Sequence, residues 1–293
     1  MKKVVFLSMD SLAGFICYDW LAFEPLRELG WQAEEISWRK PDVEWDKYDA
    51  VIVRSTWDYQ SDPIKFSVVL EKINNSSAYL ENELSIMKWN MNKNYLKDLQ
   101  DKGIRIVDTV WGKTFIPQKV EYYFDFLGSD EIIIKPNISA SAENTFRIKK
   151  YDAKNHLPVL EPVFRKREFM VQRFIKNIIN EGEYSLFYFG GEYSHSILKV
   201  PKENDFRVQE EHGGKLFSVN PDEELKKTAE KILRSVKPLP LYARIDLVRT
   251  QDNDFALIEL ELIEPSLYFN LDDESPRRFA GVFDEWMKKN LHN

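Results

Sequence analysis

The sequence predicts a mixed protein, α/β in its first third and α+β in the remainder, and two observations carry that prediction. In the first hundred residues strand-like and helix-like segments alternate, which is the order expected of a parallel, doubly wound sheet. After about residue 115 short strands follow one another, and Gly190-Gly191 between two of them is the strongest hairpin signal in the chain. The second part is therefore expected to be mostly antiparallel, with added helices.

The N-terminal part is expected to hold strands joined by helices. Val4 begins a short apolar run typical of a buried strand, and Gly30 and Gly103 stand where two predicted helices stop. The predicted strands are residues 4–8, 31–38, 50–55 and 104–110, and the predicted helices are residues 20–29, 63–74 and 92–102.

The later part is read from apolar runs bounded by turn residues. Gln251 to Asp254 is a turn-forming tetrapeptide between two strands, and the C-terminal segment is amphipathic. The predicted strands are residues 131–136, 145–149, 169–174, 184–189, 193–200, 241–250 and 255–263, and the predicted helices are residues 221–236 and 276–291.

Composition excludes several classes of protein. The chain has 293 residues with 43% hydrophobic content, enough for a real core, while 11 Gly and 13 Pro are too few for a fibrous protein. Lys plus Arg number 41 against 48 Asp plus Glu, a net charge of −7 without a basic block, which argues against nucleic-acid binding.

The sequence also predicts a soluble cytoplasmic protein. No apolar stretch approaches the roughly 18 residues of a membrane span, and the N-terminal apolar run meets Asp10 too early for a signal peptide. The single cysteine, Cys17, has no partner for an intrachain disulfide, and its apolar neighbours favour a buried thiol over a nucleophile.

Acidic residues alternate along the last two predicted strands. Arg244 and Asp246 share one face, and Glu259 and Glu261 share a face of the paired strand. Three carboxylates that converge repel one another and need a cation, and an oxygen-only set suits Mg²⁺ rather than zinc. The alternative is the solvated face of an edge hairpin.

Single cations stand at strand ends. Lys135 follows an apolar strand and precedes residues 137–145, a loop rich in small and hydroxyl side chains, while Lys199 ends a hairpin strand and Arg207 follows it. In an acidic chain this placement indicates a local anion site, since such donors can hold a polyphosphate. The alternative is a scattered, solvated surface.

Arg54 and Asp58 follow the strand 50–53 at its carboxyl end, where open α/β sheets bind ligands. Arg54 is a candidate partner for a substrate carboxylate, and Asp58 for its amine. The alternative is a satisfied ion pair or a turn cap.

A series of motifs occurs in a fixed order over nearly the whole chain. They are residues 54–59, Ile134-Lys135-Pro136, residues 170–175 and 181–185, Lys199-Val200-Pro201, Asp205-Phe206-Arg207, residues 212–214, and the Arg-x-Asp and Glu-x-Glu hairpin. This order resembles the ATP-grasp superfamily, and the spacing is similar to that of glutathione synthetase-like ligases. The resemblance is strongest to the branch that includes the cyclo-ligase of D-cycloserine biosynthesis.

The resemblance implies an ATP-grasp fold with three domains, and nucleotide bound between the last two. These are an N-terminal pre-ATP-grasp α/β domain at residues 1–114, a central lid at 115–175 and a C-terminal antiparallel-sheet domain with the metal site at 176–293. It also implies residue roles: Lys93, on the helix after Asn92, and Lys135 for ATP phosphates; Lys199 for cofactor binding; Gln172, Arg173, Phe174 and Ile175 for adenine; Glu181 and Glu183 for ribose; Asp246, Glu259 and Glu261 for metal; Arg207 and Arg244 for the transferring phosphoryl group.

Two positions depart from the family pattern. Many relatives have Asn where Glu261 stands, so Glu264 is an alternative metal ligand, and the loop 137–145 is poorer in Gly than usual.

The function that the resemblance implies is ATP-dependent ligation or cyclisation of a small, amino-acid-like carboxylate. An acyl phosphate forms, an amine attacks it, and ADP and phosphate leave. The expected cofactors are ATP and Mg²⁺ or Mn²⁺, and the expected partners are small-molecule carboxylate and amine substrates. Two alternatives remain: a non-catalytic ATP-binding regulatory module, and a carboxylate kinase that stops at the acyl phosphate.

Overall fold

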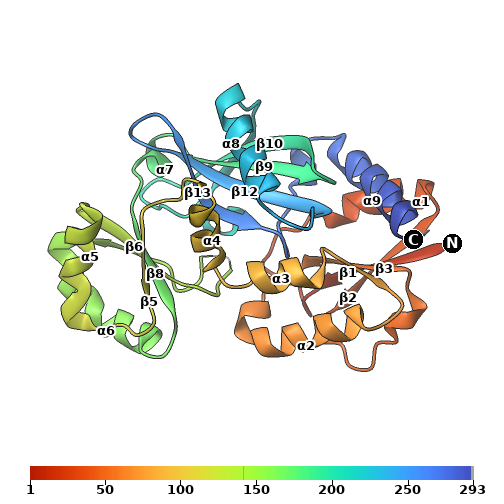
Figure 1. Cartoon of the computed structure of the whole chain (residues 1–293), viewed down its shortest axis with the longest axis horizontal. Coiled ribbons are helices and arrows are strands. Elements are labelled where there is room, and N and C mark those ends of the chain that lie inside the picture. The colour runs from red at the N-terminus through yellow and green to blue at the C-terminus, as the bar shows by residue number, and fades with distance from the viewer. Residues whose placement is uncertain (141, 292–293) are drawn as a thin grey trace.

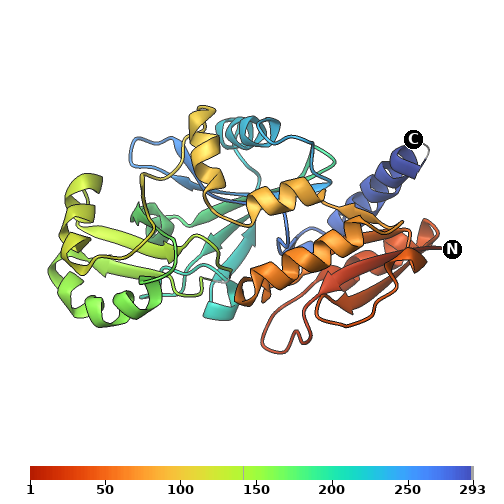
Figure 2. The same cartoon turned by 60° about the horizontal axis from the view of Figure 1, so that its bottom comes forward.

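The chain folds around three β-sheets, as seen in a computed structural model that describes residues 1–140 and 142–291. The lid lies at one end of the molecule, the N-terminal sheet at the other, and a five-stranded sheet between them (Figures 1 and 2). Ser141, in the predicted phosphate loop, lies outside the described residues.

The N-terminal sheet is parallel, as predicted, with strand order β2-β1-β3-β4. Helices α1 and α9 cover one face, where they pack on Val4 and Phe6, and α2 covers the other, where it packs on Val5 and Leu7. Its elements are β1 (Lys2–Ser8), α1 (Phe23–Glu28), β2 (Trp31–Ser37), β3 (Ala50–Ser55), α2 (Pro63–Asn74), β4 (Tyr79–Glu81) and the C-terminal α9 (Ser275–Leu291).

Two details of this unit differ from the prediction. The helix expected at residues 20–29 is a 3₁₀ turn, Asp19–Ala22, followed by the short α1. The strand β4 was not predicted, because three residues show too little pattern.

The lid is an antiparallel sheet of order β5-β8-β6-β7. Helices α5 and α6 pack on one of its faces, where Phe124 of α5 and Phe164 of α6 meet Phe169 of the sheet. Its elements are β5 (Thr109–Gly112), α5 (Val120–Leu127), β6 (Glu131–Pro136), β7 (Phe146–Lys149), α6 (Ala153–Phe164) and β8 (Phe169–Arg173).

The strand predicted at residues 104–110 is largely wrong. Ile106 makes only an isolated bridge to Leu257 of the central sheet, and the true strand, β5, begins at Thr109 and pairs within the lid. The apolar residues Ile104 and Ile106 are buried without forming a ladder, so their pattern resembled a strand. The domain boundary at residue 115 stays a prediction, although β5 lies before it.

The central sheet is antiparallel, with order β11-β10-β9-β12-β13. Gly190 and Gly191 turn the β9–β10 hairpin with φ values of +57° and +92°, as their predicted role requires. The strands are β9 (Glu183–Phe189), β10 (Glu192–Val200), β11 (Lys215–Ser218), β12 (Tyr242–Arg249) and β13 (Phe255–Glu261).

Helices cover one face of this sheet, and its other face packs against the N-terminal unit. Leu96 and Leu99 from α4 meet Ile232 from α8 on the first face. The helices on this face are α3 (Leu84–Asn90), α4 (Tyr95–Asp101) and α8 (Glu223–Arg234). Ile178 of the short α7 (Asn177–Asn180) packs instead with Val248 and Ala256, whose side chains lie on the other face. Within the described part of the chain, none of the helices is both long and apolar enough to cross a bilayer.

Short 3₁₀ turns complete the connections. They are Trp45–Lys47, Tyr59–Ser61, Pro117–Lys119, Lys150–Asp152, Glu210–His212 and Phe269–Leu271.

Candidate functional site

A cavity lies between the lid and the central sheet, and residues from all three parts of the chain line it. The lid contributes Lys135 and Gln172, and the central sheet contributes Glu259 and Glu261. Residues after β3, including Trp57, close the wall on the N-terminal side. Most of the predicted site residues therefore meet at one place.

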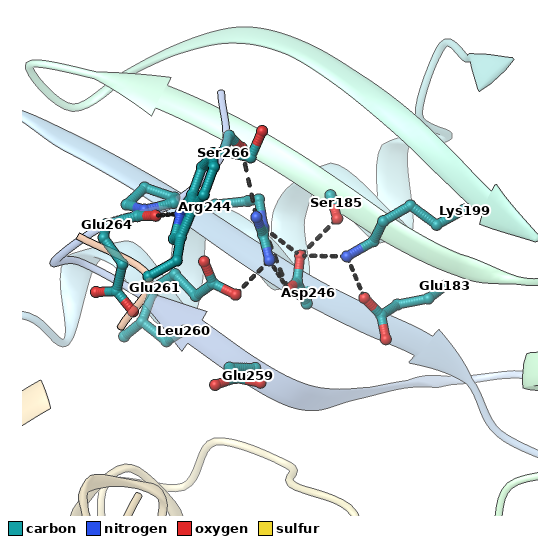
Figure 3. A network of polar contacts seen from close by, with 12 residues as sticks. Glu183, Ser185, Lys199, Arg244, Asp246, Glu259, Leu260, Glu261, Glu264 and Ser266 are labelled. Atoms are coloured by element: carbon teal, nitrogen blue, oxygen red, sulfur yellow. Dashed lines mark hydrogen bonds and ion pairs between the residues drawn. The ribbon is translucent and has the colours of Figure 1, made fainter. Parts of the chain in front are cut away.

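The predicted carboxylate hairpin forms with the expected register. Asp246 on β12 stands opposite Glu259 on β13, and Arg244 stands opposite Glu261. The Arg244 guanidinium donates to Asp246 through Nε and Nη2, at 3.0 and 2.9 Å, and also donates to Glu261 (Figure 3). The converging face is present, and part of its charge is already neutralised by the protein.

Asp246 is buried and is not among the residues that line the cavity, so its role as a metal ligand stays a prediction. Its side chain is enclosed by the Ser185 hydroxyl, which donates to Oδ1 at 2.5 Å, by Arg244, and by Lys199 Nζ at 3.5 Å. Burial alone would raise the pKa of Asp246, but the charges of Arg244 and Lys199 outweigh burial and hold this pKa at about 2. Asp246 is a fixed anion that orders two cations beneath the cavity floor.

Glu259, Glu261 and Glu264 do line the cavity. Burial, with repulsion from Asp246 and Glu259, raises the pKa of Glu261 to about 7 despite Arg244. Burial and the Glu261 charge raise the pKa of Glu264 to about 8. The raised pKa values show that Glu261 and Glu264 are hard to ionise where they stand close together. A cation bound between them would lower these pKa values and favour the ionised carboxylates.

The donor chemistry fits a divalent cation that prefers oxygen, with Glu259 and Glu261 as its ligands. Their side chains are 27% and 23% exposed and face the cavity. Among the residues described, however, no three or more His, Cys, Asp or Glu side chains are grouped so that they could hold a metal ion. Mg²⁺ is commonly held by one or two carboxylates, with phosphate oxygens and water completing its shell.

The three lysines predicted to bind the cofactor all line the cavity, but their ammonium groups have different partners. Lys93 Nζ donates to the Ser139 carbonyl at 2.8 Å and pairs with Glu259 at 2.9 Å. It lies in the turn before α4 rather than on the predicted helix, because that helix begins only at Tyr95. Lys199 is buried against Glu183 and Asp246.

Lys135 is the exception among these lysines. It projects from β6, is 8% exposed, and has no hydrogen-bond or ion-pair partner within the described residues. Burial lowers the pKa of Lys135, Lys93 lowers it further, and Glu259 opposes that change. A buried cation without a partner indicates a place for an anionic ligand.

The four residues predicted to contact adenine, residues 172–175, line the cavity at the end of β8. The N–H groups of Arg173 and Phe174 donate to the carbonyls of Asp108 and Glu131. The Ile175 N–H donates to no acceptor within the described residues. This segment therefore offers one unused backbone donor at the cavity edge.

The two carboxylates predicted to bind ribose lie in different surroundings. Glu183 lines the cavity and pairs with Lys199. Glu181 does not line it, since its carboxylate accepts from Tyr184 at 2.6 Å and from Arg249 at 3.0 Å.

Arg207 lies on the cavity wall, half-exposed, and its guanidinium pairs with Asp205 at 2.7 Å. The Asp205 carboxylate therefore compensates much of the charge of Arg207. The hydrogen bond from Arg207 in turn lowers the pKa of Asp205.

Arg54 and Asp58 do not line the cavity, so the predicted substrate contacts have no support in the geometry. Asp58 accepts from Trp38 Nε1 at 2.6 Å and from Arg39 Nε at 2.9 Å. Arg54 is fully buried, and its Nη2 donates to Asp19 at 3.0 Å, while Nε and Nη1 have no partner among the described residues. Both residues do stand at the end of a strand of the parallel sheet, as predicted, but their polar groups bind other side chains of the protein.

Aromatic residues of the cavity wall were missed. Phe15, Trp57, Tyr59 and Tyr268 line the cavity, and the sequence analysis gave aromatic residues no role because most of them belong to the core. Trp57 stood inside a recognised motif, which was the one available signal. The cysteine carries no such role, since burial raises the pKa of Cys17 to about 12 and keeps the thiol protonated.

Comparison with known proteins agrees with this geometry. Residues 4–82 match the family described as the N-terminal domain of D-cycloserine synthetase DcsG, and residues 104–250 match the ATP-grasp domain of prokaryotic glutathione synthetase. The cycloserine biosynthesis protein DcsG of Streptomyces lavendulae is 25% identical over 97% of this chain and 99% of its own length.

Solved structures show the same fold. The crystal structure of D-cycloserine synthetase DcsG has a TM-score of 0.83 at 23% identity and covers 97% of this chain and 99% of its own. D-alanine–D-alanine ligase from Bacillus anthracis has a TM-score of 0.69 at 14% identity over 99% of this chain and 98% of its own. Because the glutathione synthetase match covers half of the chain, this protein belongs to the glutathione synthetase-type ATP-grasp ligases, enzymes that form carbon–nitrogen bonds.

Proposed function

We propose that this protein uses ATP to activate a small, amino-acid-like carboxylate as an acyl phosphate, which an amine of the same or a second molecule then attacks. The observation that carries the proposal is the unpartnered, buried Lys135 facing the same cavity as the carboxylates of β13. A cation suits a triphosphate, and carboxylates suit the divalent ion that accompanies it. The similarity to DcsG supports an amino-acid-like substrate.

The nucleotide is proposed to lie with its adenine at residues 172–175, where the Ile175 N–H is available as a donor. Its phosphates would then extend toward Lys135 and Lys93. Phe174, which lies under the Arg147 guanidinium at 4.0 Å, offers an apolar side wall for the base.

The reaction proceeds in two displacements. An oxygen of the substrate carboxylate attacks the γ-phosphorus, the bond from that phosphorus to the bridging oxygen breaks, and ADP leaves. The amine nitrogen then attacks the acyl carbon, phosphate leaves with the former carboxylate oxygen, and the nitrogen loses a proton. Lys135 and Lys93 supply positive charge near the transferring group, and Arg207 on the same cavity wall adds to it when the substrate displaces its contact with Asp205.

Arg244 lines the cavity and donates to Glu261 and Asp246, so in this proposal it orients a carboxylate there and adds positive charge to the same wall. A divalent cation, Mg²⁺ or Mn²⁺, held by Glu259 and Glu261 would neutralise charge on the phosphate oxygens. Glu264 is the remaining carboxylate on the same wall.

The test is ADP release from ATP in the presence of Mg²⁺ and a panel of L- and D-amino acids, their side-chain derivatives and amines. Lys135→Met should lower the rate by about 100-fold, since it removes one transition-state cation. Glu259→Gln should lower it by at least about 10-fold and raise the Mg²⁺ concentration needed for half-maximal rate. Both variants should stay folded, because neither side chain lies in an apolar core cluster.

Lys149→Met is the matched control, because Lys149 is an exposed lysine on the neighbouring lid strand β7. It should retain the wild-type rate. Wild-type rates in Lys135→Met would contradict the proposed phosphate site. Tight ATP binding without ADP release for any compound would instead indicate the non-catalytic alternative.

A further inference from the structure

The segment that follows β13, residues 264–268, forms one wall of the cavity, and we call it the strap. The side chains of Glu264, Ser266 and Tyr268 line the cavity, whereas Pro265 and Leu267 are buried on the opposite side. The strap therefore presents alternate side chains to the ligand space, as an extended segment does.

Side chains from elsewhere in the molecule hold the strap by its backbone. Four consecutive carbonyl groups each accept a hydrogen bond from a different side chain. They are Glu264 O from Trp57 Nε1 at 2.9 Å, Pro265 O from Arg54 Nη2 at 2.7 Å, Ser266 O from Arg244 Nη1 at 3.4 Å, and Leu267 O from His195 Nε2 at 3.0 Å. Irregular backbone is seldom satisfied so completely by side chains, so the position of the strap is tightly specified.

The donors come from two different sheets. Arg54 and Trp57 follow or end β3 of the N-terminal sheet, while Arg244 and His195 belong to β12 and β10 of the central sheet. A carbonyl only accepts, so His195 must carry its proton on Nε2, and burial keeps the ring neutral by lowering its pKa to about 4. The strap thus joins the two sheets at the cavity.

Arg54 is the most deeply placed of these donors. It is fully buried, it shares Nη2 between Pro265 O and Asp19 at 3.0 Å, and its guanidinium lies 5.1 Å from the centre of the Tyr242 ring. The Tyr242 hydroxyl lies 2.7 Å from the Val53 carbonyl, beside Arg54, and 2.9 Å from the Ile263 carbonyl, next to the strap. A charge-assisted bond from a side chain fixed in this way restrains the strap more than a neutral surface bond does.

We propose that Arg54 is a positioning residue for the substrate other than ATP: by holding the Pro265 carbonyl it places Glu264, Ser266 and Tyr268 against that substrate. It does not touch the substrate. The lid, which carries the adenine segment, and the N-terminal sheet, which carries Arg54, lie at opposite ends of the molecule (Figure 1). The strap therefore acts on the end of the cavity away from adenine. The existence of that second substrate rests on the proposed function.

The first test does not need the substrate. Hydrogen–deuterium exchange is compared between peptides covering the strap and peptides covering residues 170–176, and ADP with Mg²⁺ is titrated by calorimetry. In Arg54→Met, which keeps the length of the side chain but removes its donors, strap amides should exchange about 10-fold faster or more. Exchange at 170–176 and the ADP affinity should stay within about twofold of wild type.

Two further variants make the result specific. Arg54→Lys retains one charged donor, so it should give strap exchange between wild type and Arg54→Met. Arg39→Met is the matched control: Arg39 is an arginine of the same unit that pairs with Asp58 and makes no contact with the strap. It should match wild type. If Arg54→Met does not fold, the same comparison with Arg54→Lys decides the matter.

The second test uses whichever compound of the ADP-release panel supports turnover. Arg54→Met should raise the KM for that compound by about 10-fold and leave the KM for ATP unchanged. Unchanged strap exchange in a folded Arg54→Met, faster exchange throughout the protein, or an equal rise in both KM values would overturn the proposal. If no compound is turned over, the proposed function fails, while the exchange comparison still decides the role of Arg54.

Discussion

Glu81, at the end of β4, is a buried carboxyl group whose ionisation the fold opposes. It is 4% exposed and its main polar contact is the Trp286 indole, which donates to Oε1 at 2.8 Å. Burial raises the pKa of Glu81 from 4.5 to about 7, although the Trp286 hydrogen bond acts in the opposite direction. The carboxyl group therefore binds a proton in the folded protein at pH values where the unfolded chain has lost it.

This predicts a stability that falls as the pH rises. Between about pH 4.5 and 7 the folded state binds more protons at Glu81 than the unfolded state, so the contribution of Glu81 to the free energy of unfolding decreases across that window and is constant on either side of it. Glu81→Gln, which stays neutral, should be more stable than wild type at pH 8 by roughly 3 kcal/mol, with the difference vanishing near pH 4.5.

Urea denaturation from pH 4.5 to 8 measures this difference. Glu203→Gln is the control, because Glu203 is exposed and is not among the groups that act on Glu81; it should follow the wild-type pH dependence. A difference between Glu81→Gln and wild type that does not change with pH would show that the carboxyl group ionises normally in the fold.

At the same scale, the sequence could predict the candidate residues but not how the protein uses them. Alternation along two strands was enough to place Arg244 opposite Glu261. It could not show that Lys199, from a third strand, neutralises Asp246 and leaves it outside the cavity. Distant partners decide whether a charged side chain meets a ligand, and periodicity carries no information about them.

Helix α6 shows a similar limit at the scale of elements. Pro158 and Pro162 lie inside it, so the usual rules predict a break where the structure has twelve helical residues. Leu160 and Phe164 bury one face against the lid sheet, and this packing outweighs the local preference. Strands β6 and β12 were predicted well because their apolar patterns are long and bounded by turns.

Replacing a proline within α6 should therefore stabilise the lid. Pro158 is exposed, and Pro158→Ala restores a backbone donor and removes a ring that conflicts with the preceding turn. The gain of up to about 3 kcal/mol in helix propensity is offset by about 1 kcal/mol of added freedom in the unfolded chain, so we expect a net 1–2 kcal/mol.

Thermal and urea unfolding of Pro158→Ala measure the effect. Pro63→Ala is the matched control, because Pro63 opens α2, where a proline is already compatible with the helix. It should be neutral or slightly destabilising. A destabilised Pro158→Ala would mean that the prolines set the shape of the lid.

At the scale of the whole molecule, one buried amide joins the N-terminal unit to the central sheet. Asn82 is fully buried; its Nδ2 donates to the carbonyls of Tyr242 and Leu262 at 2.9 and 2.7 Å, and its Oδ1 accepts from the Leu241 N–H at 2.7 Å. Its partners lie about 160 residues or more along the chain, so sequence reasoning had no means of finding this contact.

Asn82→Ala should destabilise the whole protein by about 3–5 kcal/mol, because several buried backbone groups lose their partner at once. The urea midpoint measures this loss. Asn74→Ala, at an exposed position on α2, should change it by less than about 0.5 kcal/mol. Equal midpoints for the two variants would show that the Asn82 contacts contribute nothing net.

The way the chain enters and leaves the lid has a mechanical consequence. β5 leads in and β8 leads out, and these strands are neighbours, with Thr109 opposite Gln172. The two places where the chain enters and leaves the lid therefore lie side by side, next to the residues predicted to contact adenine. They define one line about which the lid could rotate. If the lid swings about that line, Lys135 travels farther than residues 172–175. Such a swing would break contacts that join the lid to the rest of the chain, among them Lys93 Nζ to the Ser139 carbonyl, the Lys93 N–H to the Asn137 carbonyl, and Gln60 to Glu143. The phosphate end could then open to release products while the segment predicted to contact adenine moves least.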